Sequence, residues 1–154
     1  MTAENVDDLI QSQGFSGPVD LLSLDIDGND YWVWKAIDAV QPRVVVLEFP
    51  ANCGPDRRVT IAYDPDFRLD MSQRPYRCGA SLSAFAALGR LKGYRLVGVQ
   101  SLGINAFFVR QGLAEDLLPA VTVRECYERS HRLAAWQTAQ LESLMAGSQK
   151  WQDV

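Results

Sequence analysis

Asp20-Leu21-Leu22-Ser23-Leu24-Asp25-Ile26-Asp27-Gly28-Asn29 is the stretch of this chain that decides its fold. Its first part belongs to a run from Val19 to Ile26 that is apolar on both faces at its centre, which predicts a buried parallel strand. Gly28 then makes a turn, and a helix begins at Asn29 or Asp30. The stretch therefore predicts a strand that ends in acidic residues and runs directly into a helix.

The sequence downstream extends this start into an α/β domain. The helix ends at Gln41-Pro42, and Arg43 to Phe49 is a second β-branched strand, so the three elements form a βαβ unit. Ser81 caps a helix over Leu82 to Leu91. A β-hairpin follows, with strands at 94–99 and 105–110, and an amphipathic helix is expected from Thr122 to about Met145. Residues 50–79 form a long loop of the kind that often covers a binding site.

Length, composition and charge restrict the functional classes. With 154 residues, of which 47% are hydrophobic, we expect a single domain over residues 1–154. A net charge of -4 argues against nucleic-acid binding, which requires clustered Lys and Arg. No apolar run approaches the roughly 20 residues of a membrane helix, and the acidic N-terminus does not resemble a secretory signal, so we expect a cytoplasmic protein.

Cysteine and histidine contents exclude several kinds of site. Cys53, Cys78 and Cys126 are odd in number and contain no C-x-x-C pair, so we expect reduced, mostly structural thiols. His131 is the only histidine. A multi-histidine metal site is thereby excluded, and a solvated helical position is the favoured interpretation of His131.

Acidic residues follow both predicted parallel strands, where ligands bind in open α/β sheets. Asp25 and Asp27 end the first strand and Glu48 ends the second, so we predict that these three residues form a catalytic rim. Such carboxylates suit proton transfer or a hard cation such as magnesium, for which Asp25 and Asp27 are the candidate ligands. The alternative is structural: Asp27 and Asp30 cap the helix, and Asp25 binds loop amides.

One resemblance is to the phosphatases of the haloacid dehalogenase type. Leu22 to Asn29 is similar to their first motif, in which Asp25 would be the nucleophile and Asp27 the general acid, and Val97 to Ser101 resembles the second motif. Asn29 stands where that family usually has threonine, and the late pair of magnesium-binding acids is missing. This interpretation is therefore ranked second.

A longer resemblance is to the FkbM-type methyltransferases. It is carried, in order, by segments that lie within Asn5 to Arg110: Asp20 to Trp34, Pro42 to Phe49, Tyr63 to Pro65, Gly79 to Leu82, Lys92 to Gly98 and Gly103 to Arg110. The resemblance implies the distal half of a class I fold that depends on S-adenosylmethionine (SAM), a partial Rossmann-like sheet of parallel strands with a final antiparallel hairpin. By this resemblance residues 1–112 would form that half, and we expect residues 113–154 to form a C-terminal helical extension with a long helix.

The SAM cradle of that family has no counterpart in this sequence. In members of that family, further βα units and a Gly-rich loop precede the segments matched here. No two glycines of this sequence stand in a G-x-G arrangement. The strand from Leu21 to Asp25 should then have an open outer edge. We expect this edge to be covered by the first helix, by the same strand in a homodimer, or by a partner chain.

Beside the phosphatase, two classes of function remain open. The first is an O-methyltransferase-related enzyme that acts on a small metabolite, and its variant is a cofactor-independent tailoring enzyme that uses the acidic rim. The second is a non-catalytic, partner-binding or dimeric remnant. For the substrate we single out Trp32, Asn52, Ser81 and Asn105. Trp32 and Trp34 point about 200° apart on a helix, so one of them should contact something other than the sheet.

Overall fold

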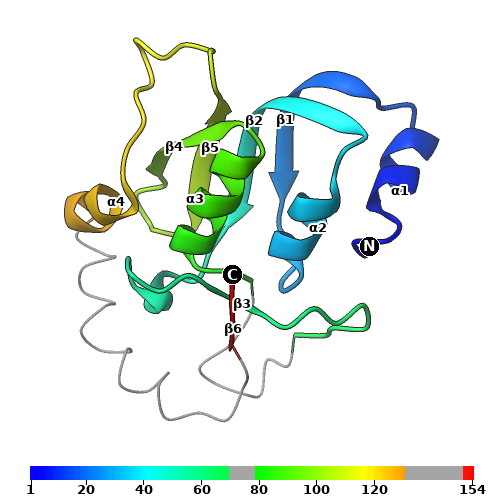
Figure 1. Ribbon diagram of the computed structural model, residues 1–154, viewed down its shortest axis with the longest axis horizontal. Coiled ribbons are helices and arrows are strands. Elements are labelled where there is room, and N and C mark those ends of the chain that lie inside the picture. Colours follow the sequence, from blue (N-terminus) through cyan, green and yellow to red (C-terminus); the bar gives the residue numbers. More distant parts are fainter. Residues whose placement is uncertain (70–78, 131–150) are drawn as a thin grey trace.

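A four-stranded mixed sheet forms the centre of the protein in this computed structural model, which describes residues 1–69, 79–130 and 151–154 (Figure 1). The strand order is β1-β2-β5-β4, with β1 at Gly17–Leu24, β2 at Val40–Glu48, β5 at Asn105–Arg110 and β4 at Tyr94–Val99. β1 and β2 are parallel, whereas β5 is antiparallel to both β2 and β4. The predicted α/β class, with a parallel pair followed by a hairpin, is confirmed.

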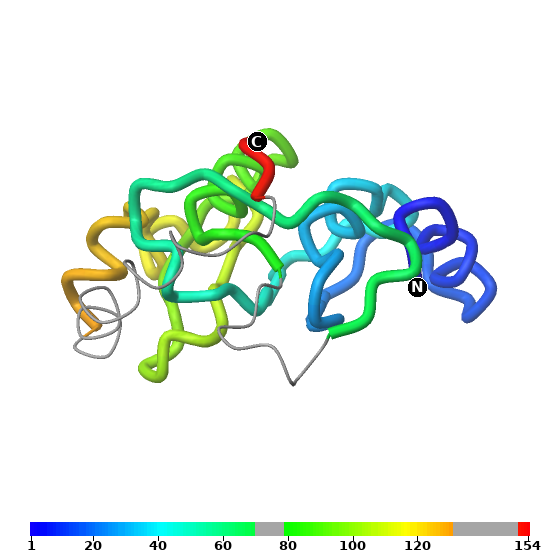
Figure 2. The backbone as a smooth tube through the Cα atoms, turned by 90° about the horizontal axis from the view of Figure 1, so that it is seen from below, coloured from blue at the N-terminus to red at the C-terminus, as the bar shows by residue number. Residues whose placement is uncertain are grey.

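Two helices cover one face of this sheet. α2 (Asp30–Ala36) and α3 (Leu82–Leu91) lie side by side on the same face (Figures 1 and 2). The Ser81 side chain accepts a hydrogen bond from the Ala84 amide, so the predicted cap of α3 is confirmed. Trp34 is 1% exposed and lies at the centre of the core, with its ring centroid 5.3 Å from that of Phe108. The apolar faces of both helices are thus buried against the sheet, with α3 packed mainly on β4.

β1 is an edge strand, and its burial differs from the prediction. In the described part of the chain only β2 pairs with it, and Leu21 is 58% exposed. The apolar run was interpreted as buried on both faces, which is wrong for Leu21 because the helices pack on the opposite face. The first helix was one candidate to cover this edge. Helix α1 (Val6–Ser12) is bound to the α2–β2 connection, where the Asp7 carboxylate accepts hydrogen bonds from the amides of Asp38 and Ala39.

The C-terminal region also corrects the prediction of a long helix. α4 spans Val123–Arg129 and begins with a capping box between Thr122 and Glu125. It ends after seven residues, because Ser130 adopts an extended backbone (φ -101°, ψ 105°). The remainder of the predicted helix, with His131, lies outside the described residues. Residues 151–153 are not helical but form β6 (Trp151–Asp153), which pairs with β3 (Val59–Ile61) in a small antiparallel sheet.

Residues 61–67, which we call the strap, run from β3 across the beginning of α2. The indole nitrogen of Trp32 donates a hydrogen bond to the Ile61 carbonyl at 2.9 Å, and the Asn29 side chain donates to the Asp64 carbonyl at 2.6 Å. Trp32 therefore contacts the strap while Trp34 enters the core, which confirms that the two indoles serve different surfaces. The long predicted loop is thus partly ordered by its contacts with α2. Cys78 lies outside the described residues.

None of the helices in the described ranges combines the length and the apolar character that a membrane span requires.

Candidate acid-base site

Three carboxyl groups converge where the parallel strands end. One carboxylate oxygen from each of Asp25, Asp27 and Glu48 lies within 4.8 Å of the other two. Asp25 follows β1 and Glu48 is the last residue of β2, and the strands run in the same direction, so both acids reach the same edge. The structure therefore brings together the three acids that the sequence predicts as a catalytic rim.

Asp30 holds the turn that carries two of these acids. Its carboxylate accepts hydrogen bonds from the Ile26 amide at 3.0 Å and the Gly28 amide at 2.9 Å. Burial is the main cause that raises the pKa of Asp30, and these amide bonds oppose it. The backbone of Asp27 adopts the left-handed conformation with φ 58°, which Asp and Asn tolerate better than most residues. The turn thus leaves the Asp25 and Asp27 side chains exposed.

The alternative interpretation was that the acids have only structural roles. Of these acids, only Asp30 has such a role, and it is not the predicted role of helix cap. Asp30 is the first residue of α2, and the N-cap residue is Asn29, whose side chain makes no capping bond. Asp30 therefore binds the amides of the turn that precedes the helix, the role that was expected of Asp25. Asp25 and Asp27 remain on the surface.

Glu48 is the electrostatically unusual member of the rim. Its pKa is raised from 4.5 to about 7, first by burial, then by a side-chain hydrogen bond and repulsion from Asp25, with smaller repulsion from Asp27 and Asp30. A carboxyl group that titrates near neutrality exchanges a proton at the pH of the cell.

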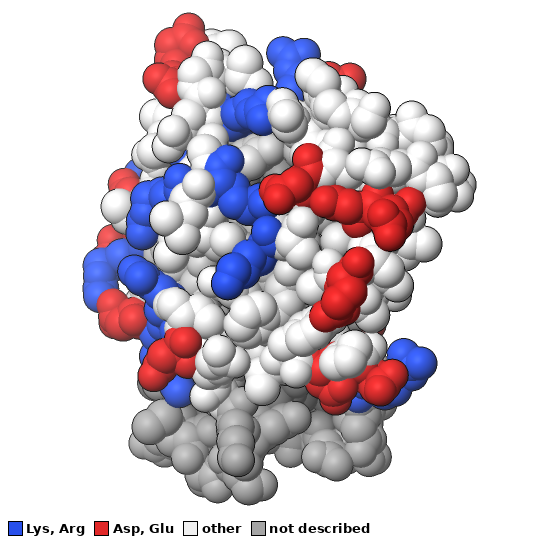
Figure 3. Space-filling view, turned by 45° about the vertical axis from the view of Figure 1, so that its right-hand side comes forward, with Lys and Arg blue, Asp and Glu red and all other residues white. Residues whose placement is uncertain are grey.

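The charged residues on the surface are separated by sign. Figure 3 shows acidic side chains in a band beside a region that is rich in Lys and Arg.

The residues proposed to contact a substrate fall into two groups. Asn105 pairs directly with Glu48 across β2 and β5, so the two side chains point to the same face of the sheet. Asn52 is 7% exposed, and its Oδ1 has no hydrogen-bond partner among the described residues. Ser81 is fully buried and Trp32 binds the strap, so the contacts of both are structural. Of the four, Asn105 has a demonstrated position beside the rim.

The turn does not provide a cradle for SAM. Gly28 is the glycine of the strand-to-helix turn, and its amide already donates to Asp30. The Phe67 ring packs so closely on it that an added Cβ would lie 2.3 Å from the ring. A nucleotide cofactor requires free amides and open space at such a turn. The residues present therefore do not fit SAM at this position.

Phe67 and Asp64 are contributors that the sequence analysis did not identify. Phe67 covers Gly28, and the Asp64 backbone holds Asn29, so the strap fixes the turn from outside. Asp64-Pro65 has the composition of a turn, but sequence spacing does not show where a strap will lie.

Comparisons with protein-family models, with curated proteins and with solved structures gave no match.

Proposed function

We propose that this chain is an enzyme with a methyltransferase-like fold of the FkbM type that acts on a small metabolite by acid-base chemistry rather than by methyl transfer. The observation that carries the proposal is the convergence of Asp25, Asp27 and Glu48 to within 4.8 Å at the ends of β1 and β2. The mixed sheet supports the fold part of the proposal, because its parallel pair and hairpin are the elements that the resemblance implies.

Glu48 is the proton-transferring group in this proposal. In its ionised form it takes a proton from a C–H or O–H group of the substrate, and in its protonated form it returns that proton to another atom of the same molecule. Asp25 accepts the hydrogen bond of protonated Glu48, and Asp27 adds negative charge that favours the protonated form. The net reaction is an isomerisation or a cyclisation, because no atom is gained or lost.

A divalent cation fits the same residues. Asp25, Asp27 and Glu48 supply the carboxylate oxygens that Mg²⁺ prefers, and their spacing allows a single ion to contact all three. Bound Mg²⁺ would polarise a substrate oxygen and lower the pKa of Glu48. The same ligands belong to the dehalogenase-type alternative, in which Asp25 is the nucleophile of a phosphatase.

We also propose that β1 pairs with β1 of a second copy. Backbone groups on its outer side have no strand partner in the described part of the chain, and the side chain of Leu21 is exposed beside them. Open apolar edges promote association between strands. A homodimer closes this edge, and so would a partner chain of the kind expected for a non-catalytic remnant.

The activity is tested by proton exchange in D₂O. A panel of small hydroxycarbonyl compounds is incubated with the protein, and loss of the α-proton signals is followed by ¹H NMR. We expect exchange that needs no SAM, follows Glu48 ionisation with a midpoint near pH 7 and disappears in Glu48→Gln. Exchange that is equal in Glu48→Gln would refute the proposal. Absence of exchange, together with calorimetric binding of SAM, would restore methyl transfer, and phosphate release lost in Asp25→Asn would favour the phosphatase.

A further inference from the structure

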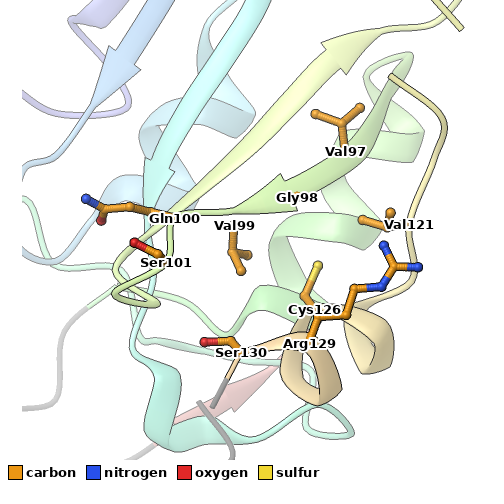
Figure 4. Close-up of a pocket in the computed structure, with 9 residues that line it drawn as sticks. All are labelled: Val97, Gly98, Val99, Gln100, Ser101, Val121, Cys126, Arg129 and Ser130. Carbon is orange, nitrogen blue, oxygen red and sulfur yellow. The ribbon is translucent and has the colours of Figure 1, made fainter. Parts of the chain in front are cut away.

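A cavity of about 400 Å³ lies between the outer edge of β4 and helix α4. One wall is the segment from Val97 to Ser101, and the other is formed by Cys126 and Arg129 of α4 and by Ser130 after it, with Val121 between them (Figure 4). The volume falls within the range of small-molecule pockets. The cavity is formed by different residues from those of the acidic rim.

The path of the chain explains why this space is open. The segment before α4 runs along the edge of β4, where the Val121 amide donates to the Leu96 carbonyl at 2.9 Å. The capping box at Thr122 then turns the chain into α4. The pairing of β4 with β5 shifts between Leu96 and Gly98, which marks a β-bulge. The end of β4 beyond the bulge is therefore left beside α4.

One hydrogen bond shows how the end of β4 is oriented. The Gln100 amide donates to the Asn105 carbonyl, so the backbone of Gln100 is turned toward β5. Because alternate residues of an antiparallel strand face alternate neighbours, the backbone N–H and C=O of Val99 point outward.

The lining is apolar in its body and cationic at one side. Val97, Val99 and Val121 contribute methyl groups. Burial raises the pKa of Cys126 to about 11, so its thiol stays neutral and adds to the apolar wall. The Arg129 guanidinium lies beside Val121 in Figure 4, and one of its nitrogens pairs with Glu125 at 3.1 Å. A guanidinium has five N–H donors, so this pairing leaves donors for an anion.

Gly98 contributes to the open space beside β4, because it has no side chain. An added Cβ at this residue would meet no atom within 4 Å, and its backbone is not in the left-handed region. The absence of a side chain here therefore creates room without being demanded by the backbone. A glycine inside a strand commonly marks a bulge, and Gly98 stands at the register shift of β4.

We propose that this cavity binds a small carboxylate with an apolar aliphatic tail. The tail lies against the three valines and Gly98, and the carboxylate lies against Arg129. Ser101 and Ser130 line the same space. This proposal is independent of the acid-base chemistry at the rim.

The test uses octanoate and 1-octanol, which share a tail and differ in charge. Isothermal calorimetry on the full chain should show saturable binding of octanoate, with 1-octanol at least tenfold weaker. Gly98→Leu fills the cavity and should abolish binding of both. Arg129→Gln should weaken octanoate about tenfold and leave 1-octanol unchanged, whereas Arg90→Gln, an exposed arginine on α3, serves as the matched control.

Three results would overturn the proposal. The first is that octanoate does not bind saturably to the wild type. The second is that folded Gly98→Leu binds octanoate as tightly as the wild type does. The third is that Arg129→Gln and Arg90→Gln lose octanoate binding to the same extent. Folding of each variant is checked by circular dichroism. If Gly98→Leu does not fold, the comparison of the two arginine variants still decides the outcome.

Discussion

A carboxylate oxygen of Asp25 lies within 4.8 Å of one from Glu48, and the two side chains share a hydrogen bond. They come from the ends of two parallel strands, so the sheet itself brings them together. Burial is the first cause of the raised pKa of Glu48, and a proton shared between the two carboxyl groups raises it further because it relieves their repulsion. This relationship joins the fold to the proposed chemistry.

Replacing Glu48 with Gln should stabilise the protein at alkaline pH. The folded protein holds the Glu48 proton up to a pKa of about 7, whereas the unfolded chain loses it near 4.5. The free energy of unfolding therefore falls as the pH rises through this window, because the folded state binds more protons. After solvent screening we expect Glu48→Gln to gain about 1–2 kcal/mol at pH 8.5 and little at pH 4, measured by urea unfolding.

Glu125→Gln is the control of opposite sign for that measurement. The backbone amide and side chain of Thr122 lower the pKa of Glu125, so its stabilising effect is present above its unfolded pKa and is lost as the pH falls. This variant should be less stable than wild type at neutral pH. If both Gln variants change stability with the same sign at pH 8.5, the electrostatic account of Glu48 is wrong.

Millimolar Mg²⁺ should raise the melting temperature of the wild type. Binding to the folded state alone adds about 2.7 kcal/mol when the ion is at 100 times its dissociation constant. Asp27→Asn should remove the effect and keep the turn, because Asn tolerates the positive φ at this position. Asp116→Asn, at an exposed acid outside the rim, is the control. A melting temperature that does not respond to Mg²⁺ would leave the acids as a metal-free proton-transfer site.

Leu21→Lys should convert a dimer into a monomer. Leu21 lies on the open edge strand, where a charged side chain opposes association. Light scattering coupled to size exclusion at micromolar concentration should give a dimer for the wild type and a monomer for the variant. Leu91→Lys is the control, because Leu91 is 85% exposed on α3, away from β1. A monomeric wild type would contradict the dimer proposal.

Substitution of the two tryptophans of α2 should differ strongly in cost. Trp34 packs against Phe85, Tyr94 and Phe108, so Trp34→Ala should reduce the free energy of unfolding by about 3–5 kcal/mol. Trp32→Phe removes one hydrogen bond to Ile61, for which we expect about 1 kcal/mol. Chemical denaturation measures both. Equal losses would show that Trp34 is not the main aromatic anchor of the core.

The sequence predicted the sheet better than its surroundings. β-branched residues in Val44 to Leu47 and the hairpin at 94–110 are local signals, and the observed strands follow them. The acids at the strand ends could be predicted because parallel strands end at one edge. The exposure of Leu21 and the end of α4 at Arg129 depend on what packs against them, which residue spacing does not encode.

The cavity beside α4 illustrates a second limit. Gly98 interrupts a strand-like run and so signals an irregularity, but only the structure shows that α4 leaves open space opposite it. Likewise, Phe67 on Gly28 joins residues 39 positions apart without any motif. Tertiary packing of this kind decides which exposed groups become part of a site.

The titration of the Glu48 carboxyl carbon, followed by ¹³C NMR in protein labelled at the glutamate side chains, tests the central claim most directly, with Glu48→Gln used to assign the signal. We predict a midpoint near pH 7 in the wild type and a lower midpoint in Asp25→Asn, because the repulsion from the Asp25 carboxylate is then removed and a neutral amide oxygen is a weaker hydrogen-bond acceptor. A wild-type midpoint near 4.5 that does not change in Asp25→Asn would contradict the account.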